Sequence, residues 1–410
     1  MLASFESKTI DIGARLRPPA DAERRASRIP ATVDVAVVGA GIIGLSIGWR
    51  LAARGLSVAV FDRAEAGTGT TLASTGMLAA AAEHEAGGDD LLALALDSQA
   101  RWHPYREALE ADSGMKIDYR GEGTMLVALA RDEVERLRFR FEIQKRANLD
   151  ARWLGGVEAR ALEPGLRGPV AAGIFCSSDH QVDPRLVSAA LKRAFLARGG
   201  LLFENVEVVS IDREAGRARG IVCAAGACRA TTTIVATGVW SGETLAPLGI
   251  DIPIRPLKGQ ALALKTSRQT GNLTRVVWTE QIHMSPKSDG RLIVGATMED
   301  TGFNAAITVG GALALLEGVH RALPSSEEME IEAIWSGYRP TSDDDAPILG
   351  ETGVPGLLLA TGHHRNGILL APATAAALEE LVVNGAMSGS ASRFGLARFA
   401  KRPAHAGVAT

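Results

Sequence analysis

The sequence predicts an α/β protein of two domains, a Rossmann-like domain on a parallel sheet and a second domain on a discontinuous antiparallel sheet. Two observations lead to this prediction. Residues 33–62 have the order strand, glycine-rich turn, helix and strand that is typical of a βαβ unit. Residues 206–236, 254–264 and 276–296 instead have the pattern of short strands separated by turn residues. A chain of 410 residues is long enough for two domains.

The first half of the βαβ unit has a physical reason for each glycine. Residues 33–38 are almost all apolar, as expected for a strand that is buried on both faces. Gly39, Gly41 and Gly44 follow with the spacing G-x-G-x-x-G. The first glycine permits a tight turn, the second lets the backbone approach a pyrophosphate, and the third allows the helix to pack closely on the strand. A helix is predicted over residues 42–54, and its N-terminus offers free N–H groups to phosphates.

The second half of the unit ends in an acid. Asp62 directly follows the predicted strand 57–61, at the place in the unit where a carboxylate accepts the hydroxyl groups of a ribose. A glycine-rich turn alone would be weak evidence, but here strand, helix, second strand and acid are all in register. We therefore predict a dinucleotide site. The sequence contains no G-x-x-x-x-G-K-[ST], H-E-x-x-H or G-x-S-x-G segment, so it lacks the signals of phosphate-loop nucleotidases, metalloproteases and α/β-hydrolases.

The bulk composition excludes several classes of partner. The formal net charge is −3, which gives no electrostatic argument for binding nucleic acid or an anionic membrane. No apolar stretch approaches the roughly 20 residues that span a bilayer, so we expect no integral membrane segment. Residues 1–30 form a polar arm without the apolar centre of a signal peptide. Three cysteines are too few for a zinc site of two pairs, so we predict no metal and a cytoplasmic localisation.

Further helices and strands follow along the chain. Helical spacing of apolar residues predicts helices over 89–110, 131–148, 181–198, 307–322 and 368–383. Strands are expected within 117–130 and over 357–360, with turns at Lys258–Gly259 and at 288–290. The last strand and helix form a second strand–loop–helix unit with a glycine-rich loop. Because the sequence has one good dinucleotide fingerprint, it favours an enzyme that passes electrons from a small substrate to FAD over a flavin reductase with its own nicotinamide site.

Eight segments in order resemble the FAD-dependent amino-acid oxidase family, which includes D-amino-acid oxidase, sarcosine oxidase and glycine oxidase. The segments are VVGAGIIGLS (37–46), STGMLAAAAE (74–83), DHQVDPRLV (179–187), ATGVWSGE (236–243), RPLKGQALAL (255–264), GRLIVGATMED (290–300), SGYRPTSDDDAPILG (336–350) and ATGHHRNGILLAPAT (360–374). The resemblance covers roughly residues 31–385 and is strongest to glycine oxidase. The FAD subunit of bacterial hydrogen cyanide synthase is similar too.

The resemblance implies how the domains divide the chain. The FAD-binding domain is assigned to 31–97, 170–253 and 338–385, and the substrate-binding domain to 98–169 and 254–337. The arm 1–30 and a C-terminal tail, 386–410, lie outside both. A homo-oligomer is a further expectation at the level of the family.

The resemblance also implies the FAD-binding residues, carried over position by position. The adenine dinucleotide half is assigned to Gly39, Gly41, Ile43, Gly44, Asp62 and Arg63, with Val206 contacting the adenine through its backbone. The pyrophosphate and the flavin are assigned to Thr70, Thr71, Ser74, Thr75, Gly76 and Met77, and Thr237, Gly238 and Trp240 are expected to pack beside the cofactor. The isoalloxazine is assigned to Gly362, His363, Arg365, Asn366, Gly367 and Ile368. The N-terminus of the last helix can stabilise negative charge on the reduced flavin. No residue aligns with a covalent attachment site, so non-covalent FAD is expected.

Arg339 is the strongest catalytic candidate. It matches the family arginine that grips the carboxylate of the substrate, a task that suits a guanidinium because its planar fork binds a carboxylate through two hydrogen bonds. Arg365 is expected either to add positive potential at the same place or to be a structural partner of the helix start. His283 aligns with a tyrosine of the nearest relatives. It either donates a hydrogen bond to the substrate in place of the phenol or is a packed strand residue. Lys258 is expected to be a solvated turn residue, with a place near the flavin as the alternative.

The resemblance implies oxidation of glycine or a related small, N-alkylated or D-amino acid. A hydride passes from the Cα of the neutral amine to N5 of FAD, and the imine hydrolyses to an oxo acid and ammonia or an amine. Transfer of the electrons to O₂ then gives H₂O₂, while FAD supplies the redox chemistry. One alternative is a dehydrogenase that reduces a quinone or a partner subunit. Another is a non-catalytic FAD-binding protein, although such a protein need not retain Arg339.

Overall fold

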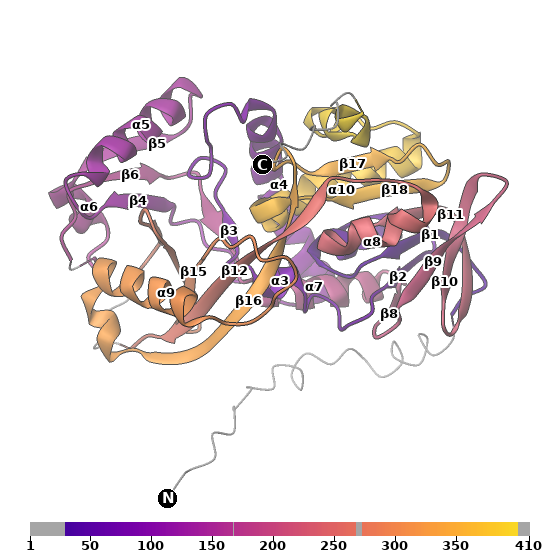
Figure 1. Cartoon of the computed structure of the whole chain (residues 1–410), viewed down its shortest axis with the longest axis horizontal. Helices are drawn as coiled ribbons and strands as arrows, with labels where there is room; N and C mark the ends of the chain where they lie inside the picture. The colour runs from indigo at the N-terminus through magenta and orange to yellow at the C-terminus, as the bar shows by residue number, and fades with distance from the viewer. Residues whose placement is uncertain (1–28, 167, 268–272, 401–410) are drawn as a thin grey trace, which may run out of the picture.

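The computed structural model describes residues 29–166, 168–267 and 273–400, and the chain folds around two eight-stranded sheets. The first sheet lies on the right of Figure 1 and the second on the left, and the long strands β12 and β16 of the second sheet lie near the middle of the view. This arrangement confirms the predicted α/β class with two sheets. Most of the predicted arm 1–30, and the end of the predicted tail 386–410, lie outside the described residues.

The first sheet is mainly parallel. Its strands follow the order β17-β18-β11-β1-β2-β8, and β9 and β10 extend β11 into a meander. The pairs of β1 with β2 and β11, of β2 with β8, and of β11 with β18 are all parallel. Its strands are β1 (Thr32–Val38), β2 (Val58–Phe61), β8 (Leu201–Phe203), β9 (Val208–Glu214), β10 (Arg217–Cys223), β11 (Gly226–Val235), β17 (Ile348–Glu351) and β18 (Leu357–Thr361).

Four helices pack together on one side of this sheet and share a single apolar core with it. They are α2 (Ile42–Ala53), α4 (Asp89–Ser113), α7 (Pro184–Ala197) and α10 (Gly367–Asn384). Trp102 of α4 is fully buried and donates its indole N–H to the carbonyl of Leu369 in α10, at 2.9 Å. Residues 364–384 are long and apolar enough to span a membrane, but 67% of their apolar window is buried, as in the core helix of a folded domain.

The second sheet is mainly antiparallel. Its order is β16-β12-β15-β14-β13-β4-β6-β5, and only the pair of β13 with β4 is parallel among the described strands. Its strands are β4 (Thr124–Ala128), β5 (Ala151–Gly155), β6 (Ala172–Cys176), β12 (Ile254–Lys265), β13 (Val276–Trp278), β14 (His283–Pro286), β15 (Arg291–Gly295) and β16 (Glu330–Ser342). Helices α5 (Glu133–Arg146), α6 (Gly156–Leu162) and α9 (Val309–Ala322) accompany it, and β3 (Met77–Leu78) pairs with β7 (His180–Gln181) outside both sheets.

The predicted turn at Lys258–Gly259 is wrong. β12 runs straight through these residues because it pairs with β16 along its whole length, with Gly259 opposite Gly337. Lys258 is 1% exposed rather than solvated, and its ammonium group lies 3.0 Å from a carboxylate oxygen of Glu299. The sequence pattern suggested a turn because lysine and glycine are common in turns, but the partner strand that overrides this preference lies much further along the chain, with Tyr338 opposite Lys258.

Strand assignment also departs from the prediction at two other places. Within 117–130 only β4 forms a strand, and Arg120 makes an isolated bridge to Gln181. β6 belongs to the second sheet although it falls in the segment 170–253 that we assigned to the FAD-binding domain. The domain boundaries therefore remain a prediction.

Candidate active site

The candidate active site begins in a cavity of about 690 Å³ at the carboxyl edge of the first sheet. Val38, Phe61, Ala236 and Thr361, which end or directly follow β1, β2, β11 and β18, all line it. Ligands of open parallel sheets bind at this edge, where the loops that leave the strands meet. The cavity therefore lies where the βαβ fingerprint predicts a dinucleotide.

The backbone around the three glycines of the fingerprint is tightly packed or borders the cavity. Gly39 has φ +106°, and a Cβ there would clash with the carbonyl of Ala236. A Cβ at Gly44 would clash with the carbonyl of Gly39, so this glycine lets α2 pack on the turn. Gly41 lines the cavity, and its nearest neighbour for an added Cβ is the hydroxyl oxygen of Thr71 at 3.4 Å. The start of α2 therefore faces the cavity, with Ile42 N donating to the same hydroxyl at 2.9 Å.

Asp62 is held at the end of β2 by two backbone hydrogen bonds. Ala40 N donates to one carboxylate oxygen at 2.7 Å and Ala64 N to the other at 2.9 Å. The carboxylate thus lies on the cavity wall beside the glycine-rich turn. Next to it, the guanidinium of Arg63 lies 4.4 Å from the ring centroid of Trp240, a cation–π contact.

Most of the predicted FAD-binding residues meet on this wall. Those that line the cavity are Gly39, Gly41, Ile43, Asp62, Arg63, Thr70, Thr71, Ser74, Val206, Thr237, Gly238, Trp240, His363, Arg365, Gly367 and Ile368. The wall also includes residues that we did not assign, among them Gly67, Thr68, Gly69, Val208, Glu243, Thr244, Pro340 and His364. Gly67, Thr68 and Gly69 belong to the small-residue loop after Asp62, so their composition was a usable signal.

Six predicted residues, Gly44, Thr75, Gly76, Met77, Gly362 and Asn366, do not line the cavity, and the structure gives several of them other contacts. A Cβ at Gly76 would clash with the carbonyl of Val182, so this glycine allows the chain to pass closely by α7. Met77 accepts a hydrogen bond at its sulfur from the indole of Trp278, at 3.0 Å. Gly362 has φ +73°, and Asn366 is 7% exposed. Thr75 contacts His283 instead of the cavity.

Arg339 lies on β16, directly before Pro340 of the cavity wall. Its guanidinium lies over Gly259, where a Cβ would come within 2.7 Å of Nη1. Nη1 donates to the carbonyl of Thr297 at 3.1 Å and to that of Lys258 at 3.4 Å. Burial and the nearby Arg365 lower the pKa of Arg339. Within the described part of the chain, no carboxylate lies within 4.0 Å of this guanidinium, so its charge is available to a ligand.

His283 begins β14 opposite Gly295 of β15. Its Nε2 lies 3.0 Å from the hydroxyl of Thr75, and its ring lies 5.7 Å from that of Trp278. Burial, together with the charges of Arg339 and Lys287, lowers the pKa of His283 to about 3, so the imidazole is neutral at physiological pH. Lys287 is held by the carbonyls of Thr75 and Val182, both at 2.8 Å, and is therefore part of the same support.

Arg365 joins the site from the start of α10, and its charge is already paired. Its Nε lies 2.8 Å from Glu83 and its Nη2 lies 2.8 Å from Glu85. The Glu83 side chain is 7% exposed, and burial raises its pKa against the opposing effect of Arg365. The sequence analysis missed Glu83, although it closes the STGMLAAAAE segment. It also missed Arg140 of α5, which donates to the carbonyl of Ala82.

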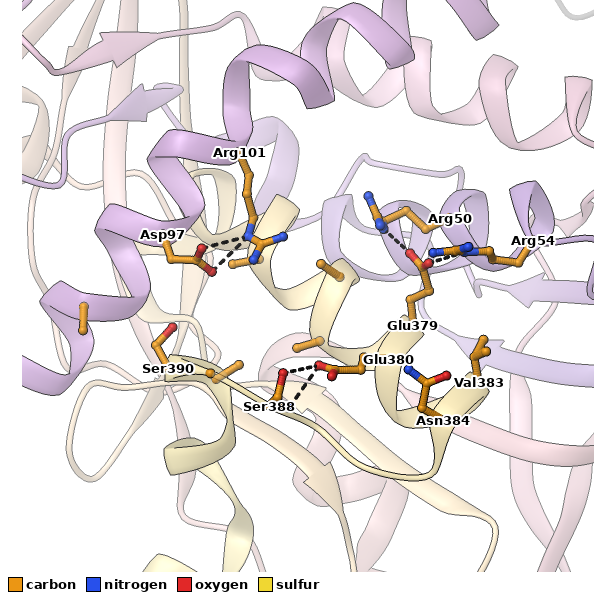
Figure 2. Close-up of a pocket in the computed structure, with 16 residues that line it drawn as sticks. Arg50, Arg54, Asp97, Arg101, Glu379, Glu380, Val383, Asn384, Ser388 and Ser390 are labelled. Carbon is orange, nitrogen blue, oxygen red and sulfur yellow. Dashed lines mark hydrogen bonds and ion pairs between the residues drawn. The ribbon is translucent and has the colours of Figure 1, made fainter.

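A second cavity of about 710 Å³ lies between α2, α4 and α10 (Figure 2). Arg50 and Arg54 both point to Glu379, and Arg101 of α4 bonds to Asp97. Each of these arginines therefore already contacts a carboxylate of the same wall. This cavity contains none of the predicted site residues, so we place the active site in the first one.

The family described as FAD dependent oxidoreductase matches residues 34–381. The chain belongs to this family. FAD is its cofactor, and the cavity fits it. The glycine turn leaves room for a pyrophosphate, the start of α2 offers N–H groups, and Asp62 presents a carboxylate at the end of β2.

Several relatives of this FAD-dependent oxidoreductase are similar over nearly their whole length. Glycine oxidase of Bacillus licheniformis is 34% identical over 351 residues, which cover 85% of this chain and 93% of the relative. Hydrogen cyanide synthase subunit HcnC of Pseudomonas protegens is 30% identical over 408 residues, covering 90% and 97%. The crystal structure of glycine oxidase from Geobacillus kaustophilus superposes with a TM-score of 0.84 at 31% identity, covering 90% and 99%.

Proposed function

We propose that this FAD-dependent oxidoreductase oxidises glycine or a related small, N-alkylated or D-amino acid at its Cα. The observation that carries the proposal is Arg339. Arg339 itself does not line the cavity, but its guanidinium is close enough to Arg365 of the cavity wall for that charge to lower its pKa. Its hydrogen bonds within the described residues go to backbone carbonyls, and such a group is well suited to bind one carboxylate. Similarity to glycine oxidases at 34% and 31% identity supports the same substrate class.

In this proposal the protein positions the substrate and FAD supplies the oxidising chemistry, accepting a hydride equivalent from Cα. Arg339 binds the carboxylate and so fixes which face of Cα meets the cofactor. A neutral imidazole has one donor and one acceptor nitrogen. Because Nε2 of His283 is engaged by Thr75, its Nδ1 is the nitrogen that can bond to the substrate. The start of α10, where Gly367 and Ile368 line the cavity, would offer N–H groups and a partial positive charge to the flavin.

The product of this oxidation is an imine, which water hydrolyses to an oxo acid and ammonia, or an amine when the nitrogen is alkylated. We propose O₂ as the electron acceptor, which gives H₂O₂, and non-covalent binding of FAD. The similarity to a subunit of hydrogen cyanide synthase favours one alternative, a dehydrogenase that passes its electrons to another acceptor. The acceptor and the substrate can be tested in one experiment.

The experiment is anaerobic titration of the FAD-loaded protein with glycine, sarcosine, D-alanine, D-proline and larger N-alkylglycines. We expect the flavin absorbance to bleach with at least one of them, and admission of air to restore it rapidly with formation of peroxide. Bleaching followed by slow recovery would instead favour the dehydrogenase. If no amino acid bleaches the flavin, the proposed function is refuted and the chain is an FAD-binding protein of another kind.

A further inference from the structure

The loop after β3 brings a carboxylate next to Arg365 of the cavity wall. Glu83 lies in this loop with its side chain 7% exposed, and its Oε2 is 2.8 Å from Nε of Arg365. Arg365, Arg140 and Arg339 all exert an attractive electrostatic effect on it. Glu83 thus lies among three guanidinium groups that come from three distant parts of the chain.

The loop that carries Glu83 is firmly held. The carboxylate of Asp179 accepts hydrogen bonds from Ala81 N and Ala82 N, both at 3.0 Å, and is itself fully buried. Arg140 reaches from α5 to donate to the carbonyl of Ala82. Because these backbone N–H groups and this carbonyl are occupied, the main chain that carries Glu83 is held beside Arg365.

The carboxylates around Arg365 are already engaged by this chain. Glu83 and Glu85 both act on Arg365 and Arg140, and the carboxylate of Asp179 binds the backbone of the same loop. Glu83 also acts on Arg339, but the hydrogen bonds of that guanidinium within the described residues go to backbone carbonyls, so it can bind one ligand carboxylate. A second ligand carboxylate close to Arg365 would meet the negative charge of Glu83.

We propose that Glu83, by pairing with Arg365, restricts the site to substrates that carry a single carboxylate. This inference rests on the proposed function, because it takes Arg339 as the group that binds that carboxylate. Because Nε of Arg365 is engaged by Glu83, a second ligand carboxylate that approaches this guanidinium either meets the charge of Glu83 or displaces it, and displacement would leave a buried carboxylate without its partner. Glu83 is thus a specificity-determining residue. It weakens the binding of ligands with two carboxylates more than it strengthens the binding of ligands with one.

The test compares unreactive ligands with one and with two carboxylates, acetate and malonate. Their dissociation constants are measured from the change in flavin absorbance of the FAD-loaded protein. In the wild type we expect malonate to bind at least about tenfold more weakly than acetate. In Glu83→Gln the freed Arg365 can accept the second carboxylate, and a charge-assisted hydrogen bond should improve the ratio for malonate by about tenfold or more.

Two further variants isolate the effect. Glu85→Gln removes the same charge from the same guanidinium, but the Glu85 side chain is 66% exposed, so we expect the ratio to change by less than about twofold. Adding Arg365→Met to Glu83→Gln should abolish the gain for malonate. Steady-state rates with sarcosine and iminodiacetate, which differ by one carboxylate, should follow the same order.

Different outcomes would contradict the role of Glu83 and the proposed function. Equal affinities for acetate and malonate in the wild type, or an unchanged ratio in Glu83→Gln, would overturn the role of Glu83. The wild-type comparison decides the question even if Glu83→Gln does not fold. If the wild type binds neither ligand at the flavin, the carboxylate site itself is absent and the proposed function fails first.

Discussion

Replacement of Arg339 by methionine tests the proposed substrate site most directly. The substitution removes a guanidinium and leaves an unbranched apolar side chain of similar length. If the guanidinium binds the carboxylate through two charge-assisted hydrogen bonds of about 1.5–3 kcal/mol each, their loss costs about 3–6 kcal/mol. At about 1.4 kcal/mol for each factor of ten, kcat/KM should fall by about 10²- to 10⁴-fold, mainly through KM.

The fold should tolerate this change. Within the described residues Arg339 has no carboxylate within 4.0 Å, and Glu83, which it also attracts, keeps its ion pair with Arg365, so the substitution leaves no buried carboxylate unpaired. We expect FAD to remain bound and Tm to change by no more than about 3 °C. The assay is anaerobic flavin reduction followed by stopped flow over a range of substrate concentrations.

A matched control lies on the neighbouring strand. Arg255 of β12 is opposite Thr341 of β16, and its side chain is 50% exposed in an ion pair with Asp300. Arg255→Met should therefore leave the substrate dependence of flavin reduction within about twofold of the wild type. Unchanged kinetics in Arg339→Met, or an equal loss in both variants, would refute the assignment of the carboxylate site.

Three further predictions concern the cofactor, acid stability and the second cavity. Gly39→Ala should release FAD on gel filtration, because φ is +106° at this position and a Cβ would clash. The control is Gly55→Ala, where φ is +84° but no atom lies within 4 Å of an added Cβ. This control should retain FAD and lower the free energy of unfolding by about 1 kcal/mol. Burial lowers the pKa of His363 to about 3 in the folded chain. Below pH 6.5 this imidazole therefore binds a proton in the unfolded chain but stays neutral in the folded chain. Stability should therefore decrease from pH 6.5 downwards, by about 1.4 kcal/mol for this group at pH 5.5, and His363→Gln should make Tm less sensitive to pH over that range. Glu379→Gln should cost about 1–2 kcal/mol in urea unfolding, because its carboxylate is 6% exposed between two partly exposed arginines, and should leave flavin reduction unchanged.

Each of these predictions has an outcome that would contradict it. Full retention of FAD in Gly39→Ala would mean that the turn can relax. A Tm that depends on pH equally in the wild type and in His363→Gln would show that other groups control acid stability. Altered flavin reduction in Glu379→Gln would show that the second cavity is coupled to the active site, although the two cavities share no lining residue.

The part of the fold that could be predicted from the sequence is the part that neighbouring residues determine. The βαβ unit has its strand, turn and helix signals together in one short segment, 33–62, and α2 indeed spans Ile42–Ala53. β16 was not predicted as a strand, since its partner β12 lies far away in the chain and its sequence, EIEAIWSGYRPTS, has no regular alternation. The same pairing of β12 with β16 explains why the turn expected at Lys258–Gly259 is part of a continuous strand.

Some residues of the candidate site could also be predicted from the sequence, and others could not. Gly39, Gly41 and Asp62 could be assigned because their spacing encodes their geometry. The ion pair of Glu83 with Arg365 could not, since the two residues lie near opposite ends of the chain and a buried carboxylate has no local signature. The sequence indicated that these residue types were present, and the fold determined which charges meet.

β16 also has a mechanical consequence. The strand is paired to β12 from Glu330 to Ser342, and the hydroxyl of Thr70, which begins the short helix α3 (Thr70–Ala73) and lines the cavity, donates to the carbonyl of Tyr338 at 2.8 Å. Thr341 makes a bridge to His363, which also lines the cavity. The position of Arg339 relative to the cavity is thus set by one strand that is fixed at several points. Inserting a single residue into it would move Arg339 by about 3.3 Å and turn its side chain to the opposite face of the sheet. New substrate preferences can therefore evolve by exchanging side chains around β16, but not by changing the length of this strand.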